Sequence, residues 1–532
     1  MKNFGVVYHI VMCYEPYEDF QYNSCVSRGI CSLSPRSSAL QTVLVLYLRL
    51  FAKYALNQEI EQYDKDFILN AVSITIYNPD FNENTFFSLV NEFKKLLPKI
   101  ICKFSEVNPL INMDEEKQKA EELFAATDEI TNAIKYGEKI FNRGVENISV
   151  EIRDLYNIML VIAKSISINL LDLKSYDEDS IDAFEAILDV FRKINLEEKD
   201  IITLKSRIYS ISEINNNIMS TLRQKQEERY GYQFASEVSY TTTPSKAVLV
   251  VGSNIRELEM VLEKVKGEEI DVYTHDEMML AHTFPKFSQY SHLRGQFGQG
   301  LESCLLDFAT FPGPIVLTKH SLHNIENLYR GRLFTTDYAS SKGVIKIENN
   351  DFTSLIEAAK NSRGFKSGKQ CETVSIGYNY EEAMQKIKNE IDSRKYERIF
   401  FIGLDGYSLE QRAYFEKLVK HTPDNILIIS FFHNIDKNNL IFLNSCFDSY
   451  GPLKVFDFVE KFDLKIDFFF PQCARDSVSQ IVYLSSYEKV RVYVGKCAPI
   501  ILNPSLMSTL QKLFNIKTLT SAKKDLEEIL SR

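Results

Sequence analysis

The feature that most constrains the fold is a strand–helix–strand pattern in the middle of the chain. Residues 247–251 form a short, continuous run of apolar and β-branched residues that ends at Gly252. A segment with helical spacing follows at 255–266, and a second apolar run follows at 270–274. Two buried strands joined by an amphipathic helix indicate a βαβ unit, because a crossover helix returns the chain to a parallel neighbour. The pattern therefore predicts a parallel sheet that is covered by helices.

The same alternation continues towards the C-terminus. The predicted elements there are strands at 315–318, 344–347, 399–402, 426–429 and 491–494, and helices at 381–395, 504–513 and 522–530. The later strands and helices indicate a second α/β unit after the first one. Two such units in one half of the chain predict two separate parallel sheets.

The N-terminal half has a different pattern. Residues from about 35 to 235 are predicted to be helical, with apolar residues at three- and four-residue spacing in 150–168 and 181–194. A polar connector without helical spacing follows at 231–246. We therefore predict a combined α and α/β fold. Its domains are a helical domain at 1–240, a first α/β domain at 241–375 and a second α/β domain at 376–532.

Charge and cysteine content exclude several classes of protein. The chain has 72 acidic and 62 basic residues, a net charge of −10, so it lacks the clustered Lys and Arg of a nucleic-acid-binding protein. Its most apolar stretch, 40–56, contains Arg49 and Lys53 and predicts a buried helix instead of a membrane span. Nine cysteines in a long chain predict a reduced, cytoplasmic setting and no disulfide scaffold.

Four segments of the α/β half carry a specific signature. They are V-Y-T-H-D-E-M-M-L-A-H at 272–282, H-L-R-G-Q-F-G at 292–298, F-P-G-P-I-V-L-T-K at 311–319 and R-L-F-T-T at 332–336. Together they resemble the hybrid cluster proteins, an iron–sulfur family also called prismane proteins or hydroxylamine reductases. The resemblance implies N-terminal helical bundles followed by two α/β domains with parallel, Rossmann-like sheets.

The resemblance also implies where a metal cluster would be held. In the family, an iron–sulfur–oxygen cluster lies where the α/β domains meet the helical domain, and one His, two Glu and four Cys bind it. Carried over by motif and spacing, the positions of the His, the first Glu and the first Cys fall on Ser253, Glu277 and Ser321. Of these three, only Glu277, in T-H-D-E-M, keeps the family residue.

The other four cluster positions lie in the last third of the chain. Two Cys positions fall on Leu404 and Phe432, a third keeps Cys446 in S-C-F-D-S-Y, and the final Glu falls on Ala474. An alternative register would place that Glu at Glu488. Five of the seven positions therefore lack the family residue, and Leu, Phe and Ala offer no donor atom. We expect the hybrid cluster to be absent and its pocket to be filled by side chains and water, with two remnant ligands left.

Three cysteines near the N-terminus have the spacing of the family's N-terminal cluster motif, C-x-x-C-x8-C-x5-C. Cys13, Cys25 and Cys31 occupy three of its four cysteine positions, and Pro16 occupies the other. Iron–sulfur clusters usually take four thiolates, and proline cannot replace one. Two interpretations stay open. One is an N-terminal iron–sulfur cluster completed by another ligand, such as a nearby glutamate. The other is a set of cysteines that no longer bind metal.

Other patterns are less specific and predict structural roles. The histidines within 274–282, with His320 and His323 downstream, do not have the H-E-x-x-H spacing of a zinc site. The segment G-Q-F-G-Q-G at 295–300 lacks the Lys-Ser/Thr ending of a phosphate-binding loop. The remaining cysteines, which have no metal-ligand spacing, are Cys102, Cys304, Cys371, Cys473 and Cys497.

Two functions follow from the resemblance, because the family reduces hydroxylamine. With most cluster ligands replaced, we expect a divergent pseudoenzyme that acts as a binding or regulatory scaffold. Its partner would be another protein or an intact paralogue, and neither nucleic acid nor a membrane span is expected. The alternative is an active iron–sulfur oxidoreductase that reduces hydroxylamine or nitric oxide through an altered cluster.

Overall fold

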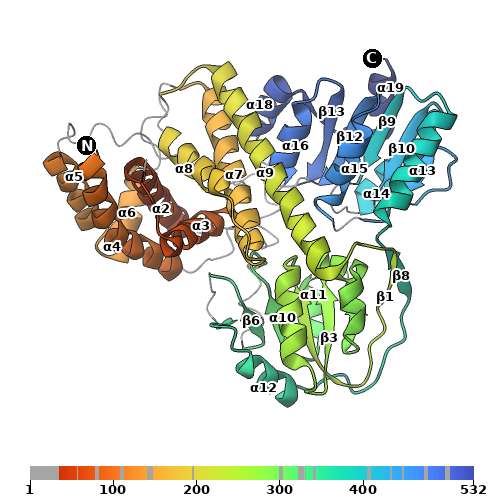
Figure 1. Ribbon diagram of the computed structural model, residues 1–532, viewed down its shortest axis with the longest axis horizontal. Coiled ribbons are helices and arrows are strands. Elements are labelled where there is room, and N and C mark those ends of the chain that lie inside the picture. The colour runs from red at the N-terminus through yellow and green to blue at the C-terminus, as the bar shows by residue number, and fades with distance from the viewer. Residues whose placement is uncertain are drawn as a thin grey trace.

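The computed structural model describes residues 35–56, 58–77, 83–107, 113–140, 148–194, 197–298, 304–321, 329, 331–338, 343–403, 409–431, 434–445, 448–472, 477–497 and 504–531. Its N-terminal helices are α2 (Pro35–Tyr54), α3 (Gln62–Tyr77), α4 (Glu83–Val107), α5 (Met113–Ala126), α6 (Ile130–Ile140), α7 (Val150–Lys174), α8 (Ile181–Lys193) and α9 (Ile201–Tyr230). Figure 1 shows the long α9 running from the helical part of the molecule towards both α/β parts.

Helix α7 is the central helix of the N-terminal half. It packs against α3, α8 and α9, and it is buried on nearly all sides. By length and composition it could cross a membrane, the one such helix among the described residues, but 83% of its apolar window is buried inside the protein. An all-round apolar helix enclosed by other helices is what the core of a large helical domain requires.

The first α/β domain contains a six-stranded sheet in the order β4-β3-β2-β5-β6-β7. Its strands are β2 (Lys246–Val251), β3 (Ile270–His275), β4 (Leu293–Gln296), β5 (Ile315–Leu317), β6 (Leu333–Thr335) and β7 (Ile345–Lys346). Its helices are α10 (Ile255–Val265), η1 (Asp276–Thr283), η2 (Pro285–Gln289), α11 (Cys304–Thr310) and α12 (Thr353–Asn361). All neighbouring strands are parallel.

The second α/β domain repeats this arrangement, with the strand order β11-β10-β9-β12-β13-β14 and parallel pairing throughout. Its strands are β9 (Arg398–Ile402), β10 (Ile426–Ser430), β11 (Leu440–Phe442), β12 (Lys465–Gln472), β13 (Val490–Cys497) and β14 (Ile516–Thr518). Its helices are α13 (Tyr380–Ser393), α14 (Leu409–His421), α15 (Gly451–Val459), α16 (Ser477–Ser485), α18 (Pro504–Phe514) and α19 (Ala522–Leu530).

A short antiparallel pair of strands accompanies the chain crossings between the domains. β1 (Ser236–Ser239) follows α9, and it pairs with β8 (Thr373–Ile376), which precedes the second α/β domain. The outgoing and returning segments are therefore hydrogen-bonded to each other. The domain boundaries drawn at 240 and 375 stay predictions; the first falls next to β1 and the second falls within β8.

The predicted fold class, a helical part followed by two parallel α/β sheets, is confirmed. The βαβ unit predicted at 247–274 is β2–α10–β3. Strand β12, at the centre of the second sheet, was not predicted from sequence. Its K-I-D-F-F-F-P-Q sequence contains Asp467 and Pro471, two residue types that strands usually avoid. Six further strands were not predicted because each spans only three or four residues: β1, β4, β6, β8, β11 and β14.

Candidate functional site at the carboxyl edges of the two sheets

All seven cluster positions follow the carboxyl end of a parallel strand. In the first sheet, Ser253 and Glu277 come two residues after β2 and β3, and Ser321 comes four residues after β5. In the second sheet, the positions come two residues after β9, β10 and β12 and four residues after β11. Those four residues, which lie outside the described ranges, are Leu404, Phe432, Ala474 and Cys446. The carboxyl ends of parallel strands share one edge, which is where α/β proteins bind ligands.

Both sheets reverse their strand order at an equivalent place. The chain runs outward from β2 to β4 and then returns to β5 on the other side of β2. It repeats this from β9 to β11 and returns to β12 beside β9. Such a reversal opens a crevice at the carboxyl edge, because the loops on its two sides turn away from each other. Strands β2 and β5, and strands β9 and β12, flank these two reversals.

The strand order bears on the alternative register for the last ligand. Glu488 lies between α16 and β13, directly before the amino end of β13, and it is exposed. The amino ends of these parallel strands lie at the opposite edge of the second sheet from the carboxyl ends of β9, β10 and β11, which its other three positions follow. Glu488 is therefore not next to the carboxyl edge.

The turn after β2 is tightly packed. Gly252 has φ +116°, and a Cβ atom on it would lie 1.9 Å from Oγ of Ser321 and 2.3 Å from Oγ1 of Thr318. The Ser321 hydroxyl is buried, lies 3.2 Å from the Thr318 hydroxyl and is held beside the β2 backbone, because Thr318 donates to the carbonyl of Val251 over 2.9 Å. Small neutral groups thus fill the space between the loops after β2 and β5.

The donors in this edge do not suit the cluster that the resemblance implies. Ser253 is exposed and Ser321 is buried in hydroxyl hydrogen bonds, while Glu277 is exposed at the start of η1. An iron–sulfur–oxygen cluster requires charged, mostly thiolate ligands, and neutral hydroxyls do not balance its charge. Among the described residues, no group of three or more His, Cys, Asp or Glu side chains is placed to hold a metal ion.

The histidines of this edge have structural partners. Nε2 of His275 lies 3.1 Å from the Asp307 carboxylate, and Nε2 of His282 lies 2.9 Å from the Thr274 hydroxyl. Burial lowers the pKa of His282 to about 4, and burial together with the Lys319 charge lowers the pKa of His320 to about 3. These two rings are therefore neutral near pH 7. His323 lies outside the described residues. The glycine-rich segment 295–300 begins inside a strand, because β4 contains Gly295 and Gln296.

A buried carboxyl group beside this edge was not predicted from the sequence. Glu257 in the first turn of α10 is 4% exposed, accepts a hydrogen bond from the backbone N–H of Lys319 over 2.9 Å and lies 3.6 Å from its ammonium group. Burial raises the pKa of the Glu257 carboxyl, which the Lys319 charge partly offsets. The Thr336 hydroxyl also donates to this carboxylate. Its only sequence signal is a glutamate on the apolar face of a predicted helix.

The chain is similar in sequence to one family of proteins. The family model described as Prismane/CO dehydrogenase family matches residues 13–431. A hydroxylamine reductase of Methanocella arvoryzae is 24% identical over 98% of this chain and 100% of its own length. One from Petrotoga mobilis is 26% identical over 96% of this chain and 100% of its own length. A solved alpha subunit of acetyl-CoA synthase/carbon monoxide dehydrogenase is 12% identical, with a TM-score of 0.48 over 99% of this chain and 87% of that one.

Proposed function

Because the chain belongs to the Prismane/CO dehydrogenase family, we propose that it is a divergent member that has lost the hybrid cluster and acts as a binding or regulatory scaffold. Its counterparts in Methanocella and Petrotoga are named hydroxylamine reductases. This chain keeps their full length but not the family's ligand set. The scaffold would act in the cytoplasm on a protein partner, which includes an intact paralogue of this chain.

The observation that carries the proposal is the donor chemistry at the carboxyl edges. On the first sheet, two of three positions hold serine, and the buried Ser321 hydroxyl is already hydrogen-bonded to Thr318. On the second sheet, three of four positions hold Leu, Phe or Ala, which cannot bind metal. Apolar side chains in such a place stabilise the fold by packing instead of coordination. On both sheets, therefore, most of these positions hold residues that are poor metal ligands or cannot bind metal.

We further propose that an N-terminal iron–sulfur centre, where it forms, is bound by Cys13, Cys25 and Cys31 with a fourth ligand other than Pro16. These residues lie outside the described ranges, and the proposal rests on their spacing alone. A three-thiolate site would be more labile than a four-thiolate site, because one iron lacks its preferred donor.

A second candidate function is an altered but active oxidoreductase that reduces hydroxylamine or nitric oxide. The observation in its favour is Glu277, which keeps the family residue and is exposed at the carboxyl edge, where a solvent ligand could reach it. Cys446 is the other family residue that is kept. Two ligands from two sheets could hold one metal ion, but a multi-iron cluster requires more.

The deciding experiment measures iron and acid-labile sulfide per chain on protein purified without oxygen, with an electron paramagnetic resonance spectrum. We expect fewer than about four irons, the content of one [4Fe–4S] cluster, with any iron lost in Cys25→Ser and unaffected in Glu277→Gln. Cys102→Ser is the control, because Cys102 is an exposed cysteine in α4. Six or more irons, lost in both Glu277→Gln and Cys446→Ser, would overturn the scaffold proposal and make hydroxylamine reduction the next assay.

A further inference from the structure

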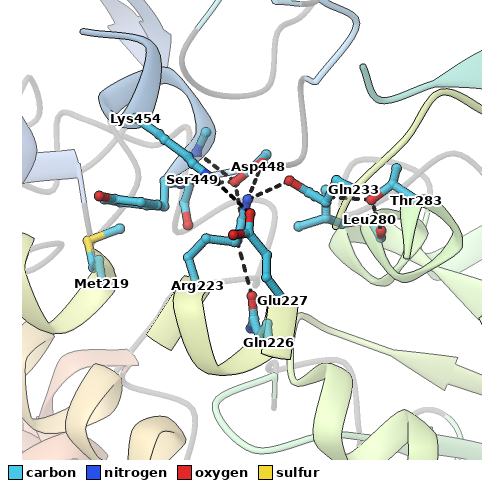
Figure 2. Close-up of polar contacts among 12 residues, drawn as sticks. Met219, Arg223, Gln226, Glu227, Gln233, Leu280, Thr283, Asp448, Ser449 and Lys454 are labelled. Carbon is cyan, nitrogen blue, oxygen red and sulfur yellow. Dashed lines mark hydrogen bonds and ion pairs between the residues drawn. The ribbon is translucent and has the colours of Figure 1, made fainter. Parts of the chain in front are cut away.

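We propose that a buried ion pair between Arg223 and Asp448 holds the two α/β domains on helix α9 and that this tie needs no metal cluster. Arg223 lies in α9, and Asp448 lies just before α15, 225 residues further along the chain. Figure 2 shows the two side chains facing each other where the domains meet. The inference goes beyond the scaffold proposal and stands independently of it.

The pair has the geometry of a strong buried contact. Nη1 of Arg223 donates to Oδ2 of Asp448 over 2.9 Å, and Nη2 donates to Oδ1 over 2.6 Å, so the contact is bidentate. The arginine side chain is 6% exposed and the aspartate side chain is fully buried. Two charges enclosed in this way are stable only when their hydrogen-bonding capacity is met.

The surroundings meet that capacity. Oδ1 of Asp448 also accepts the backbone N–H groups of Tyr450 and Gly451, over 3.1 and 2.7 Å, at the start of α15. A Cβ atom on Gly451 would lie 2.5 Å from Oδ2 of Asp448, so a glycine is required for this approach.

The same arginine reaches the first α/β domain through one glutamine. Nη1 of Arg223 donates to Oε1 of Gln233 over 2.7 Å, and Nε2 of Gln233 donates to the Thr283 hydroxyl over 3.0 Å. Thr283 ends η1, is fully buried and also accepts the backbone N–H of Phe234 at its carbonyl over 2.9 Å. One side chain of α9 is therefore hydrogen-bonded towards both α/β domains (Figure 2).

A second contact lies beside the tie on the same helix. Lys454 of α15 donates to Glu227 of α9 over 2.7 Å, and it is about a quarter exposed. Gln480 of α16 donates to the carbonyl of Ser449 over 2.7 Å and so supports the loop that carries Asp448. The tie is the fully buried centre of this contact region, and the Lys454–Glu227 pair is at its wetter margin.

The chain offers a matched control in Arg398 and Asp467. Their Nη1–Oδ2 distance is 2.6 Å, and their side chains are 7% and 0% exposed, but both residues lie within the second sheet, on β9 and β12. Oδ1 of Asp467 finds no hydrogen-bond partner among the described residues, and burial raises the pKa of this carboxyl. This pair is equally buried, but it joins no two domains.

The test is hydrogen–deuterium exchange and small-angle X-ray scattering on the full chain carrying Arg223→Met or Arg398→Met. In Arg223→Met, we expect the peptides that contain Phe234 and Gly451 to exchange roughly a hundredfold faster, because an unpaired buried carboxylate remains, and the radius of gyration to rise. In Arg398→Met, faster exchange should be confined to β9 and β12, with an unchanged radius. A metal chelator should leave the wild-type scattering curve unchanged.

Two outcomes would overturn the inference. One is an Arg223→Met protein with native exchange at Phe234 and Gly451 and native scattering. The other is a wild-type protein whose radius of gyration rises when a metal chelator is added, which would show that a metal holds the domains together. If Arg223→Met does not fold, Arg223→Lys takes its place, because lysine keeps the charge but cannot make the bidentate contact. Native exchange at Phe234 and Gly451 in that variant would also count against the tie. Iron content decides the scaffold proposal separately, so the two proposals can fail independently.

Discussion

At the residue scale, the change from thiolate or imidazole to hydroxyl alters what a strand end can do. The Ser321 hydroxyl lies within hydrogen-bond distance of the Thr318 hydroxyl and packs against Gly252, so this turn is held by a hydroxyl contact and close packing. Glu277 differs, because a carboxylate is costly to bury unpaired, and it lies at an exposed position of η1. Glu277 thus reaches water, whereas the buried Glu257 carboxyl faces the opposite charge of Lys319.

Gly252→Ala should destabilise the first α/β domain by at least about 3 kcal/mol, because the new Cβ would meet the Ser321 and Thr318 hydroxyls and φ is +116°. Gly267→Ala is the control, since φ there is +83° but a Cβ meets nothing within 4 Å, and its cost should be about 1 kcal/mol. Urea unfolding of both variants measures the difference. Equal losses would show that the packing behind Gly252 can relax.

His320→Asn should reduce the loss of stability in mild acid. Burial and the Lys319 charge lower the folded-state pKa of His320 to about 3, so its neutral form is favoured on folding. That contribution is complete above the unfolded-state pKa, near 6.5, and is lost as the pH falls towards 3. Between pH 7 and pH 5, the unfolding free energy of the variant should fall by about 2 kcal/mol less than that of the wild type.

Asparagine suits this position because the backbone of His320 has φ +64°. The control is His421→Asn, which removes an exposed histidine at the end of α14. Urea titrations at the two pH values give the comparison. An unchanged pH dependence in His320→Asn would contradict the assigned neutral state of the ring.

At the element scale, the residue that caps helix α10 also bonds to the helical domain. Oδ1 of its N-cap, Asn254, accepts the N–H of Glu257 over 3.0 Å, and its amide donates to Asp172 of α7 over 2.7 Å. Local capping is predictable from sequence, because Asn is a common N-cap residue. The second bond is not, because it depends on where α7 lies.

Because Asn254 has both roles, we expect the same substitution to cost more stability there than at an N-cap residue that only caps its helix. Asn254→Asp should lose about 2 kcal/mol of stability, because the hydrogen bond to Asp172 becomes a contact between two carboxylates. Asn379→Asp at the exposed N-cap of α13 should change stability by less than about 0.5 kcal/mol, since aspartate caps equally well. Denaturant unfolding checks both, and similar losses would contradict a specific role of the Asp172 contact.

At the scale of the whole molecule, two sheets of the same strand order are joined through one helix. Helix α9 contacts both α/β domains through residues near its C-terminal end, since Arg229 pairs with Glu259 of α10 and Arg223 pairs with Asp448 beside α15. The assembled contact region consists of arginine, carboxylate, glutamine and threonine side chains whose hydrogen bonds are met by each other. The domain arrangement can therefore be stable while the ligand positions change.

Removal of metal should consequently leave global stability unchanged. With an iron chelator present, we expect the midpoint of thermal unfolding to shift by less than about 1 °C, because a ligand stabilises a fold only by its binding free energy for the folded state. A fall of several degrees, which takes about 3–5 kcal/mol in a chain of this length, would show that a bound metal stabilises the fold. Chelator-treated Cys25→Ser separates an N-terminal centre from one at the sheets.

Hydrophobic spacing was enough to predict the two α/β units and the helical half, because this signal is local in the chain. The cluster positions at the strand ends stay predictions. It did not indicate β12, whose Asp467 is tolerated only because Arg398 lies on the neighbouring strand. It gave no signal for Arg223, which looks like any polar residue of a long helix. The pairing of Arg223 with Asp448 is visible in the tertiary structure alone. A buried charge requires a partner, and here the partner lies 225 residues away in the sequence, beyond the reach of any local pattern.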